Sequence, residues 1–241
     1  MSDSILDIVN LTRTVVQDGQ SLTVVNDISY SFQKNRIYTI IGPSGAGKSS
    51  LLRLINRLDE PTSGKVLFHG REQCDYHPCE LRQKVGYLFQ TPHLFEGTVR
   101  DNLLYASDKL TDDHIKFLAD QAQIRPEQID RPTTKLSVGE KQRVAIARLL
   151  ATCPEMILLD EPTSALDPSY TEAIEQLIVD IVSKGNLTAI VVTHHPEQAL
   201  RIGQEALLMV GGKLVESGDI NQVISDPQSE QGKLYKRKQL K

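Results

Sequence analysis

The chain has 241 residues, of which 39% are hydrophobic and 24% are charged, as in an ordinary globular protein with a buried core. Its formal net charge of −4 argues against a protein that holds nucleic acid by bulk electrostatics, although it leaves room for a local positive site. No apolar run approaches the roughly 18 residues that cross a bilayer, so we expect any membrane-spanning part of its assembly to come from another subunit.

The three cysteines, Cys74, Cys79 and Cys153, are odd in number, and residues 1–10 lack the basic start and apolar run of a secretory signal. We therefore expect a cytosolic protein with reduced thiols. His77 lies between the first two cysteines, which raises the question of a metal site. The spacing fits no standard zinc pattern, so a surface loop is the favoured interpretation.

The predicted elements alternate between strand and helix except in the middle of the chain. Strands are expected, with a turn at Asp18-Gly19 after the first, at residues 5–11, 28–32, 37–41, 65–68, 156–159, 188–193 and 206–210. Helices are expected at residues 51–58, 112–123, 139–152 and 170–183 and from residue 197 onward. Apolar strands separated by helices indicate a mainly parallel sheet covered on both faces, into which the helical middle is inserted.

A glycine-rich turn follows the strand at 37–41 and precedes the first helix. Its sequence, GPSGAGKS from Gly42 to Ser49, matches G-x-x-x-x-G-K-[ST] at every fixed position. Such a turn points backbone N–H groups at phosphate oxygens, and the helix adds its positive end. Lys48 is expected at the β- and γ-phosphates, and the Ser49 hydroxyl at Mg²⁺. The predicted nucleotide site consists of Gly42, Ser44, Gly45, Ala46, Gly47, Lys48, Ser49 and Ser50.

Two acidic residues end the apolar strand at 156–159. Asp160 should emerge at the carboxyl end of that strand, where ligands bind in open α/β sheets. We predict that Asp160 binds Mg²⁺ and that Glu161 acts as the general base toward the attacking water.

A second helix start, Leu136–Gln142, reads LSVGEKQ and lies about twenty residues before the Asp-Glu pair. Ser137 and the following N–H groups can form an anion-binding helix N-terminus, or simply a capping box that Glu140 completes. With the phosphate loop and Asp160-Glu161, this segment resembles the signature motif of the ABC (ATP-binding cassette) ATPases. The likeness extends from Leu6 to about Ser217.

The resemblance implies further roles. Gln90 matches the family's Q-loop and would contact Mg²⁺ or the attacking water, and His194 matches the switch residue at the γ-phosphate. Asp167, within Ser164–Asp167, matches the loop that crosses a dimer interface. Ser137, Gly139 and Glu140 would bind the ATP held by a second copy in a head-to-tail dimer.

Two positions depart from the family pattern. Val138 replaces a glycine of the signature, and a β-branched residue resists positive φ and close backbone approach. Val15 stands where the family stacks an aromatic ring on adenine. We therefore predict a looser signature contact, and appreciable competition of GTP with ATP.

By this likeness the fold is α/β, a P-loop NTPase with a mainly parallel central sheet, an N-terminal antiparallel β portion and an inserted helical subdomain. Residues 1–241 would form one ABC ATPase domain. Residues 1–90 and 153–241 are its nucleotide-binding core, and residues 91–152 are the helical subdomain with the signature.

The leading functional hypothesis is the ATP-hydrolysing subunit of a multi-subunit ABC transporter, with ATP and Mg²⁺ as cofactors. Its expected partners are a second copy and integral membrane subunits, with a substrate-binding protein left open and nucleic acid excluded. It would lie on the cytoplasmic face of the inner or plasma membrane. Leu94 and Phe95, within Thr91–Gly97, are the expected exposed docking anchors, with a place in the buried core as the alternative. Residues 233–241 are expected to be a solvated, partly disordered tail, and contact with anionic lipid headgroups is the weaker alternative.

Two other classes remain open. A soluble ABC ATPase that serves an assembly process, such as metal-cluster assembly, would carry the same motifs. A P-loop kinase would share the phosphate loop but would leave the signature and His194 without a role. The transported substrate, and whether it is imported or exported, are not encoded in these motifs.

Overall fold

Two β-sheets and the helices around them are described by the computed structural model, which covers residues 4–17 and 19–239. The smaller sheet is antiparallel and has the order β2-β1-β4-β5. Its strands are β1 (Ser4–Gln17), β2 (Gln20–Gln33), β4 (Ser63–Phe68) and β5 (Arg71–Glu72). The predicted turn at Asp18 lies outside the described residues.

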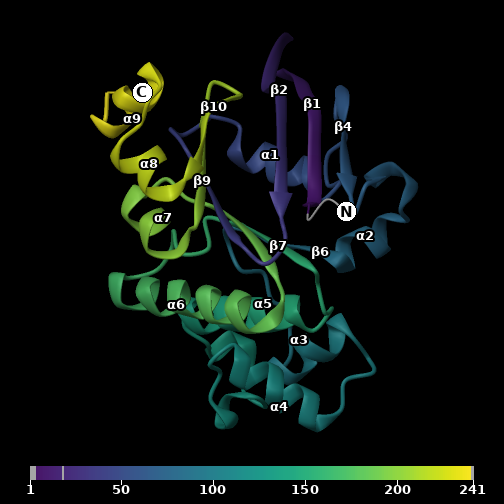
Figure 1. Cartoon of the computed structure of the whole chain (residues 1–241). Helices are drawn as coiled ribbons and strands as arrows, with labels where there is room; N and C mark the ends of the chain where they lie inside the picture. Colours follow the sequence, from purple (N-terminus) through teal and green to yellow (C-terminus); the bar gives the residue numbers. More distant parts are fainter. Residues whose placement is uncertain (1–3, 18, 240–241) are drawn as a thin grey trace.

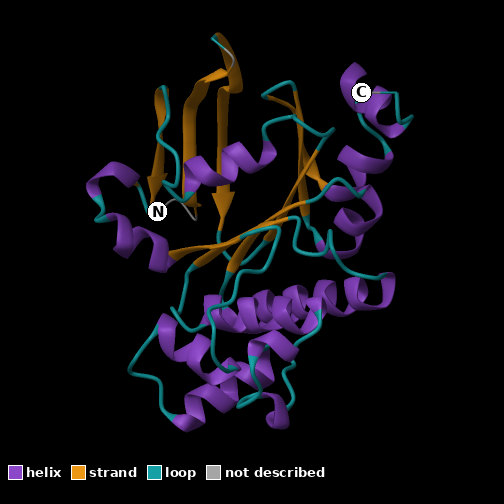
Figure 2. Ribbon diagram, turned by 180° about the vertical axis from the view of Figure 1, so that it is seen from behind, coloured by secondary structure: helices purple, strands orange, loops and turns teal. Residues whose placement is uncertain are grey.

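The larger sheet has the order β10-β9-β3-β8-β7-β6 and is parallel except for β10. Its strands are β3 (Ile37–Ile41), β6 (Val85–Leu88), β7 (Met156–Asp160), β8 (Thr188–Val192), β9 (Glu205–Val210) and β10 (Lys213–Asp219). Every residue of β3, β7 and β8 is buried, because helices cover both faces of this sheet (Figure 2). The predicted mainly parallel sheet and N-terminal antiparallel portion are confirmed.

Helix α1 (Lys48–Ile55) lies between the two sheets, and α6 (Pro168–Gly185) covers the opposite face of the larger one (Figure 1). Leu51 and Leu52 of α1 share one core with side chains from both sheets. On α6, Ile174, Leu177 and Ile178 recur at helical spacing and pack on the strands. The sheet that carries the phosphate loop is therefore fixed from both sides.

The helical subdomain connects β6 to β7 and contains α3 (Val99–Ala106), α4 (Asp112–Gln121) and α5 (Val138–Leu150). It forms the lower part of the molecule in Figure 1. Its buried side chains, among them Leu103, Leu118 and Val144, form a core of their own. Of the described helices, none is long and apolar enough to cross a membrane.

Four shorter helices were not predicted: α2 (Pro78–Lys84), α3, α8 (Ile220–Ser225) and α9 (Glu230–Lys236). The expectation of a partly disordered tail from residue 233 is wrong as far as residue 236. Helix α9 extends to Lys236. Its N-cap is Ser229, whose Oγ accepts from the N–H of Gly232 at 2.9 Å, and Tyr235 packs beside a buried cluster. Leu240 and Lys241 lie outside the described residues.

The cysteine segment is also more ordered than predicted. Cys74 lies in a short 3₁₀ turn, Gln73–Asp75, and Cys79 lies in α2, whose N-cap is His77. Both thiols are exposed. Among the residues that the structure describes, no cluster of three or more His, Cys, Asp or Glu side chains could hold a metal ion.

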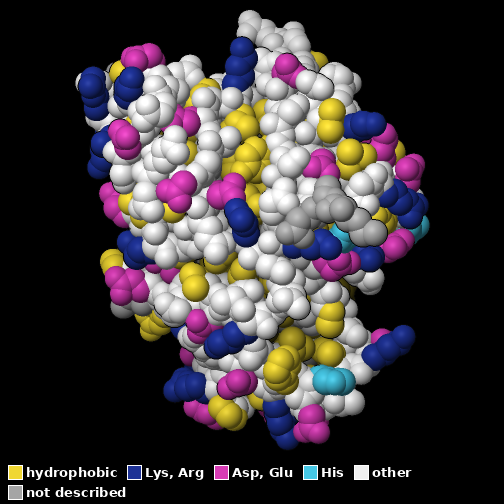
Figure 3. All heavy atoms as spheres, viewed as in Figure 1, with side chains coloured by type: hydrophobic (Ala, Val, Ile, Leu, Met, Phe, Trp, Pro, Cys, Tyr) yellow, Lys and Arg dark blue, Asp and Glu magenta, His cyan; other side chains and the backbone are white. Residues whose placement is uncertain are grey.

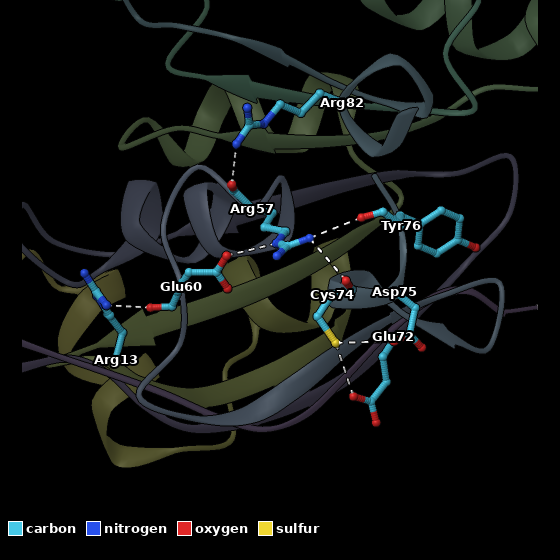
Figure 4. A network of polar contacts seen from close by, with 8 residues as sticks. All are labelled: Arg13, Arg57, Glu60, Glu72, Cys74, Asp75, Tyr76 and Arg82. Atoms are coloured by element: carbon cyan, nitrogen blue, oxygen red, sulfur yellow. Dashed lines mark hydrogen bonds and ion pairs between the residues drawn. The ribbon is translucent and has the colours of Figure 1, made fainter. Parts of the chain in front are cut away.

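Arg57, just after α1, ties this cysteine segment to the end of the helix (Figure 4). Its guanidinium donates to the carbonyl oxygens of Cys74 at 3.3 Å and Tyr76 at 3.2 Å. Its own carbonyl accepts from Arg82 of α2 at 2.7 Å, and Glu60 pairs with its Nε at 2.9 Å. The helix that begins at the phosphate loop is thereby anchored at its far end as well.

Candidate nucleotide-binding site

The phosphate loop leaves the buried end of β3 and enters α1 through Gly47, which has a φ of 94°. Lys48 is 6% exposed, and its Nζ donates to the carbonyl oxygens of Gly42 and Pro43, both at 2.8 Å. Burial lowers the pKa of the Lys48 ammonium, while the negative charges of Glu161 and Asp160 act in the opposite direction. The loop thus carries a buried cation at the start of a helix.

Two glycines of this loop are required by their surroundings. A Cβ on Gly42 would lie 2.0 Å from the carbonyl oxygen of Met209 on β9, and a Cβ on Gly47 would lie 2.1 Å from that of Val24 on β2. Both glycines also have positive φ, which other residues rarely adopt. The loop is held between the two sheets and leaves no space for larger residues at these positions.

A cavity of about 670 Å³ opens above the loop. Its lining contains the predicted residues Gln90, Glu161 and His194 and the loop itself from Ser44 to Ser50. Leu22 and Val24 of β2 also line it, and neither was predicted. Val15 does not line the cavity, although it faces Leu22 across the β1–β2 pair. The apolar wall beside the phosphate loop therefore comes from β2.

Two of the three predicted metal ligands, Ser49 in the cavity lining and Asp160 outside it, are joined by a hydrogen bond. The Ser49 hydroxyl donates to Asp160 Oδ1 at 2.8 Å, and the Tyr87 hydroxyl donates to Asp160 Oδ2 at 2.9 Å. Burial, reinforced by the carboxylate, raises the pKa of Tyr87, so this phenol stays protonated as a donor. A hydroxyl and a carboxylate are the oxygen ligands that Mg²⁺ prefers, so the pair fits that ion. Tyr87 was not predicted.

Glu161 brings the three predicted catalytic residues together. Its Oε2 accepts from Gln90 Nε2 at 3.1 Å, and its Oε1 lies 3.2 Å from His194 Nδ1. The backbone of Glu161 is left-handed, with a φ of 46°, and its N–H donates to the carbonyl of Val192 at 3.1 Å. Such a conformation is uncommon for a non-glycine residue and aims this carboxylate into the cavity.

The signature segment forms the start of α5 and does not line this cavity. Ser137 and Glu140 make the capping box, through bonds of 2.8 Å from Ser137 N to Glu140 Oε2 and 3.2 Å from Glu140 N to Ser137 Oγ. The bond from the Ser137 N–H, with the Ser137 side chain and nearby Arg131, lowers the pKa of the Glu140 carboxyl. Because the Glu140 side chain and N–H are both engaged, the outward donors are the N–H groups of Val138 and Gly139.

Val138 is 47% exposed and is the first residue of α5, with a negative φ. Positive φ therefore gives no strain at this valine, and the looser signature contact stays a prediction that rests on close backbone approach alone. Asp167 is the exposed N-cap of α6, and it too lies outside the cavity lining. The described chain thus holds two groups of predicted ligands that do not meet in one cavity.

A groove of about 560 Å³ adjoins Gln90 at the junction of core and helical subdomain. Phe95 is 44% exposed there, with its ring centroid 3.8 Å from that of Tyr105 and 5.0 Å from the Arg148 guanidinium. Leu94 is half-buried and packs against two core clusters, so its predicted role as an exposed anchor is wrong. Figure 3 shows further hydrophobic side chains on the surface of the helical subdomain.

Proteins of known family resemble this chain over most of its length. The family model described as ABC transporter matches residues 25–164. The protein STAR1 of Oryza sativa subsp. japonica is 43% identical over 210 residues, which are 86% of this chain and 60% of that protein. The phosphate import ATP-binding protein PstB 3 of Natronomonas pharaonis is 38% identical over 90% of this chain and 83% of its own length.

Among solved structures, the ATP-binding cassette MJ0796, a dimer in a post-hydrolysis state with ADP and Pi, superposes with a TM-score of 0.79. It is 28% identical, and the match covers 89% of this chain and 98% of that one. The family model spans more than half of the chain and includes both the phosphate loop and Asp160-Glu161. The chain therefore belongs to the ABC transporter family, as an ATP-binding and ATP-hydrolysing protein.

Proposed function

We propose that this chain drives a membrane transporter by hydrolysing ATP at Glu161. The observation that carries the proposal is the Glu161 carboxylate, held between Gln90 and His194 beside the buried Lys48. In the reaction, Glu161 takes a proton from the water that attacks the γ-phosphate. Lys48 balances the charge of the phosphates, and His194 holds the carboxylate and the γ-phosphate in place.

Ser49 and Asp160 would hold Mg²⁺, and Gln90 would bind either this ion or the attacking water. When bound, the ion supplies positive charge to the phosphate oxygens. Tyr87 fixes the orientation of Asp160 through its second carboxylate oxygen, so that Oδ1 stays directed at Ser49. The pairing of a hydroxyl with a buried carboxylate supports this assignment.

A second copy of the chain would complete the site. The signature donors at Val138 and Gly139 and the exposed Asp167 lie outside the cavity of their own chain, although a helix N-terminus favours an anion. A head-to-tail dimer places them on the ATP of the partner. The dimeric state of the related cassette supports this arrangement. Val15 would lie toward the base, beyond Leu22.

The groove beside Gln90 is the proposed contact with a membrane subunit. It has exposed aromatic side chains, Phe89, Phe95 and Tyr105, around the cation of Arg148, which suits an amphipathic helix with an acidic residue. Residues 91–152 would move as a subdomain against the core formed by residues 1–90 and 153–241. The protein would thus work on the cytoplasmic face of the membrane, with transport favoured over an assembly role by the import protein among its relatives.

The test compares Glu161→Gln with Glu172→Gln, an exposed acidic residue on α6. We expect Glu161→Gln to lower the ATPase kcat by at least about a hundredfold, the contribution of a general base, while ATP binding persists. Size-exclusion chromatography with light scattering should show an ATP-dependent dimer of Glu161→Gln. Glu172→Gln should behave as wild type. Hydrolysis by Glu161→Gln at the wild-type rate would refute the assignment, and a monomer at saturating ATP would refute the shared site.

A further inference from the structure

Gln198, on α7 (Pro196–Ile202), joins two segments of the site through a buried amide. Its Nε2 donates to Thr163 Oγ1 at 2.7 Å, and its Oε1 accepts from the hydroxyl of Thr193. All three side chains are almost fully buried, with exposures of 2%, 6% and 1% for Gln198, Thr163 and Thr193.

The two threonines that Gln198 contacts lie close to predicted catalytic residues in the chain. Thr163 lies two residues after Glu161 and directly before the exposed segment Ser164–Asp167. Thr193 lies directly before His194. Gln198 therefore connects two segments of the chain. One runs from Glu161 to Ser164–Asp167, and the other carries His194.

The hydrogen bonds form a chain in which each group donates to the next, from the His195 N–H to Thr163. The N–H of His195 donates to Thr193 Oγ1 at 3.1 Å, the Thr193 hydroxyl donates to the amide oxygen, and the amide nitrogen donates to Thr163. A buried polar group without a partner is costly, so this order fixes the separation of the two segments. The backbone hydrogen bond from Glu161 N to Val192 O is a second connection between the same two segments.

We propose that Gln198 is a positioning residue that keeps His194 aligned with Glu161 and makes this alignment depend on the segment Ser164–Asp167. A displacement of that segment, such as a partner subunit would produce, pulls on Thr163 and through the amide on Thr193. The side chain never touches nucleotide, since it does not line the cavity. This inference rests on the proposed function of Glu161 and His194.

An amide suits the task because it is neutral and offers both a donor and an acceptor. Leucine has a similar size but neither group, so Gln198→Leu removes both hydrogen bonds, and the Thr193 hydroxyl keeps only the bond that it accepts from His195. Thr163→Val cuts only the far bond and has the shape of threonine, so the fold is kept. Thr163→Ser retains the hydroxyl and serves as the conservative rescue.

The experiment measures steady-state ATPase and equilibrium ATP binding of the purified full chain. We expect Gln198→Leu and Thr163→Val each to lower kcat about tenfold, while KM and the Kd for ATP change by less than about threefold. The double variant should lose no more than the stronger single variant, because both cut one connection. Thr163→Ser should stay within about twofold of wild type.

Thr188→Val is the matched control. Thr188 is a buried threonine on β8 whose hydroxyl accepts from the N–H of Asn35 at 3.0 Å, outside this connection. Thr188→Val should lower the unfolding temperature about as much as Thr163→Val does, but it should leave kcat unchanged. Wild-type kcat in Thr163→Val, or equal kcat losses in Thr188→Val and Thr163→Val, would overturn the inference. Absence of ATPase in the wild-type chain, or full activity of Glu161→Gln, would instead overturn the proposed function.

Discussion

Replacing Gly47 by alanine should destabilise the protein by forcing the phosphate loop and β2 apart. The added Cβ would lie 2.1 Å from the carbonyl oxygen of Val24, whereas real contacts of this kind are not found below 3.0 Å. Because that oxygen belongs to backbone rather than to a flexible side chain, either β2 or the start of α1 must move. Gly45→Ala is the matched control, since Gly45 has a φ of 76° and nothing within 4 Å of its added Cβ.

The magnitude follows from two contributions. Left-handed backbone costs a residue with a Cβ about 1–2 kcal/mol, and both variants carry this cost. Overpacking adds about 1–3 kcal/mol, and only Gly47→Ala carries it. For a chain of this size about 1 kcal/mol lowers the unfolding temperature by roughly 2–4 °C. Gly47→Ala should therefore unfold roughly 2–12 °C below Gly45→Ala.

The assay is thermal unfolding without nucleotide, followed by circular dichroism and by calorimetry, so that effects on phosphate binding do not enter. Equal unfolding temperatures for the two variants would show that β2 yields to the alanine without cost. In that case the contact between the loop and Val24 does not fix the position of the antiparallel sheet.

Three further predictions concern docking, base recognition and pH. Phe95→Asp should abolish co-purification with the membrane proteins encoded in neighbouring reading frames. The control Phe117→Asp changes an exposed phenylalanine outside the groove and should leave co-purification intact. Retained co-purification of Phe95→Asp would contradict docking at the groove. GTP should displace bound ATP at comparable concentration, since no Phe, Tyr or Trp lines the cavity among the described residues, and a large ATP preference in competition binding would refute this. The Arg53 guanidinium, 2.7 Å from Asp59, lowers the pKa of the Asp59 carboxyl. The ionised pair therefore stabilises the fold above the usual carboxyl pKa, and this stabilisation is lost as the pH falls through the lowered pKa. Urea unfolding between about pH 5 and pH 3 should then show a smaller stability loss for Arg53→Gln than for wild type, and equal losses would contradict the pairing.

The sequence predicts the parts of this fold that have strong periodicity or fixed spacing. Strands β3, β7, β8 and β9 of the larger sheet and the long helices α5 and α6 lie close to their expected ranges, because their apolar residues repeat over several turns or fill a whole strand. The four helices α2, α3, α8 and α9, of six to eight residues, escape prediction, although α1 and α7 of similar length do not. They have too few turns to show a repeat, and their ends depend on caps such as Thr98 and Ser229, whose partners are local.

The candidate site divides in the same way. The phosphate loop and Asp160-Glu161 are recognisable from the sequence, since each lies at the end of a buried strand, whereas His194 is recognisable from its resemblance to the family's switch residue. Tyr87 is not, because its contact with Asp160 arises from the pairing of β6 with β7, strands about seventy residues apart. Leu22 and Gln198 likewise gain their roles only when other segments pack against them. An ordinary alternating strand and a short helix give no signal for either residue.

The separate core of the helical subdomain has an evolutionary consequence. Its buried side chains pack largely among themselves, and the chain enters and leaves through the loops after β6 and before β7. Substitutions on its outer surface can therefore accumulate without repacking the residues that hold the phosphate loop. We expect relatives with a similar ATP-hydrolysing core to differ most in this subdomain, and exchanging residues 91–152 between two of them would test whether it selects the partner protein.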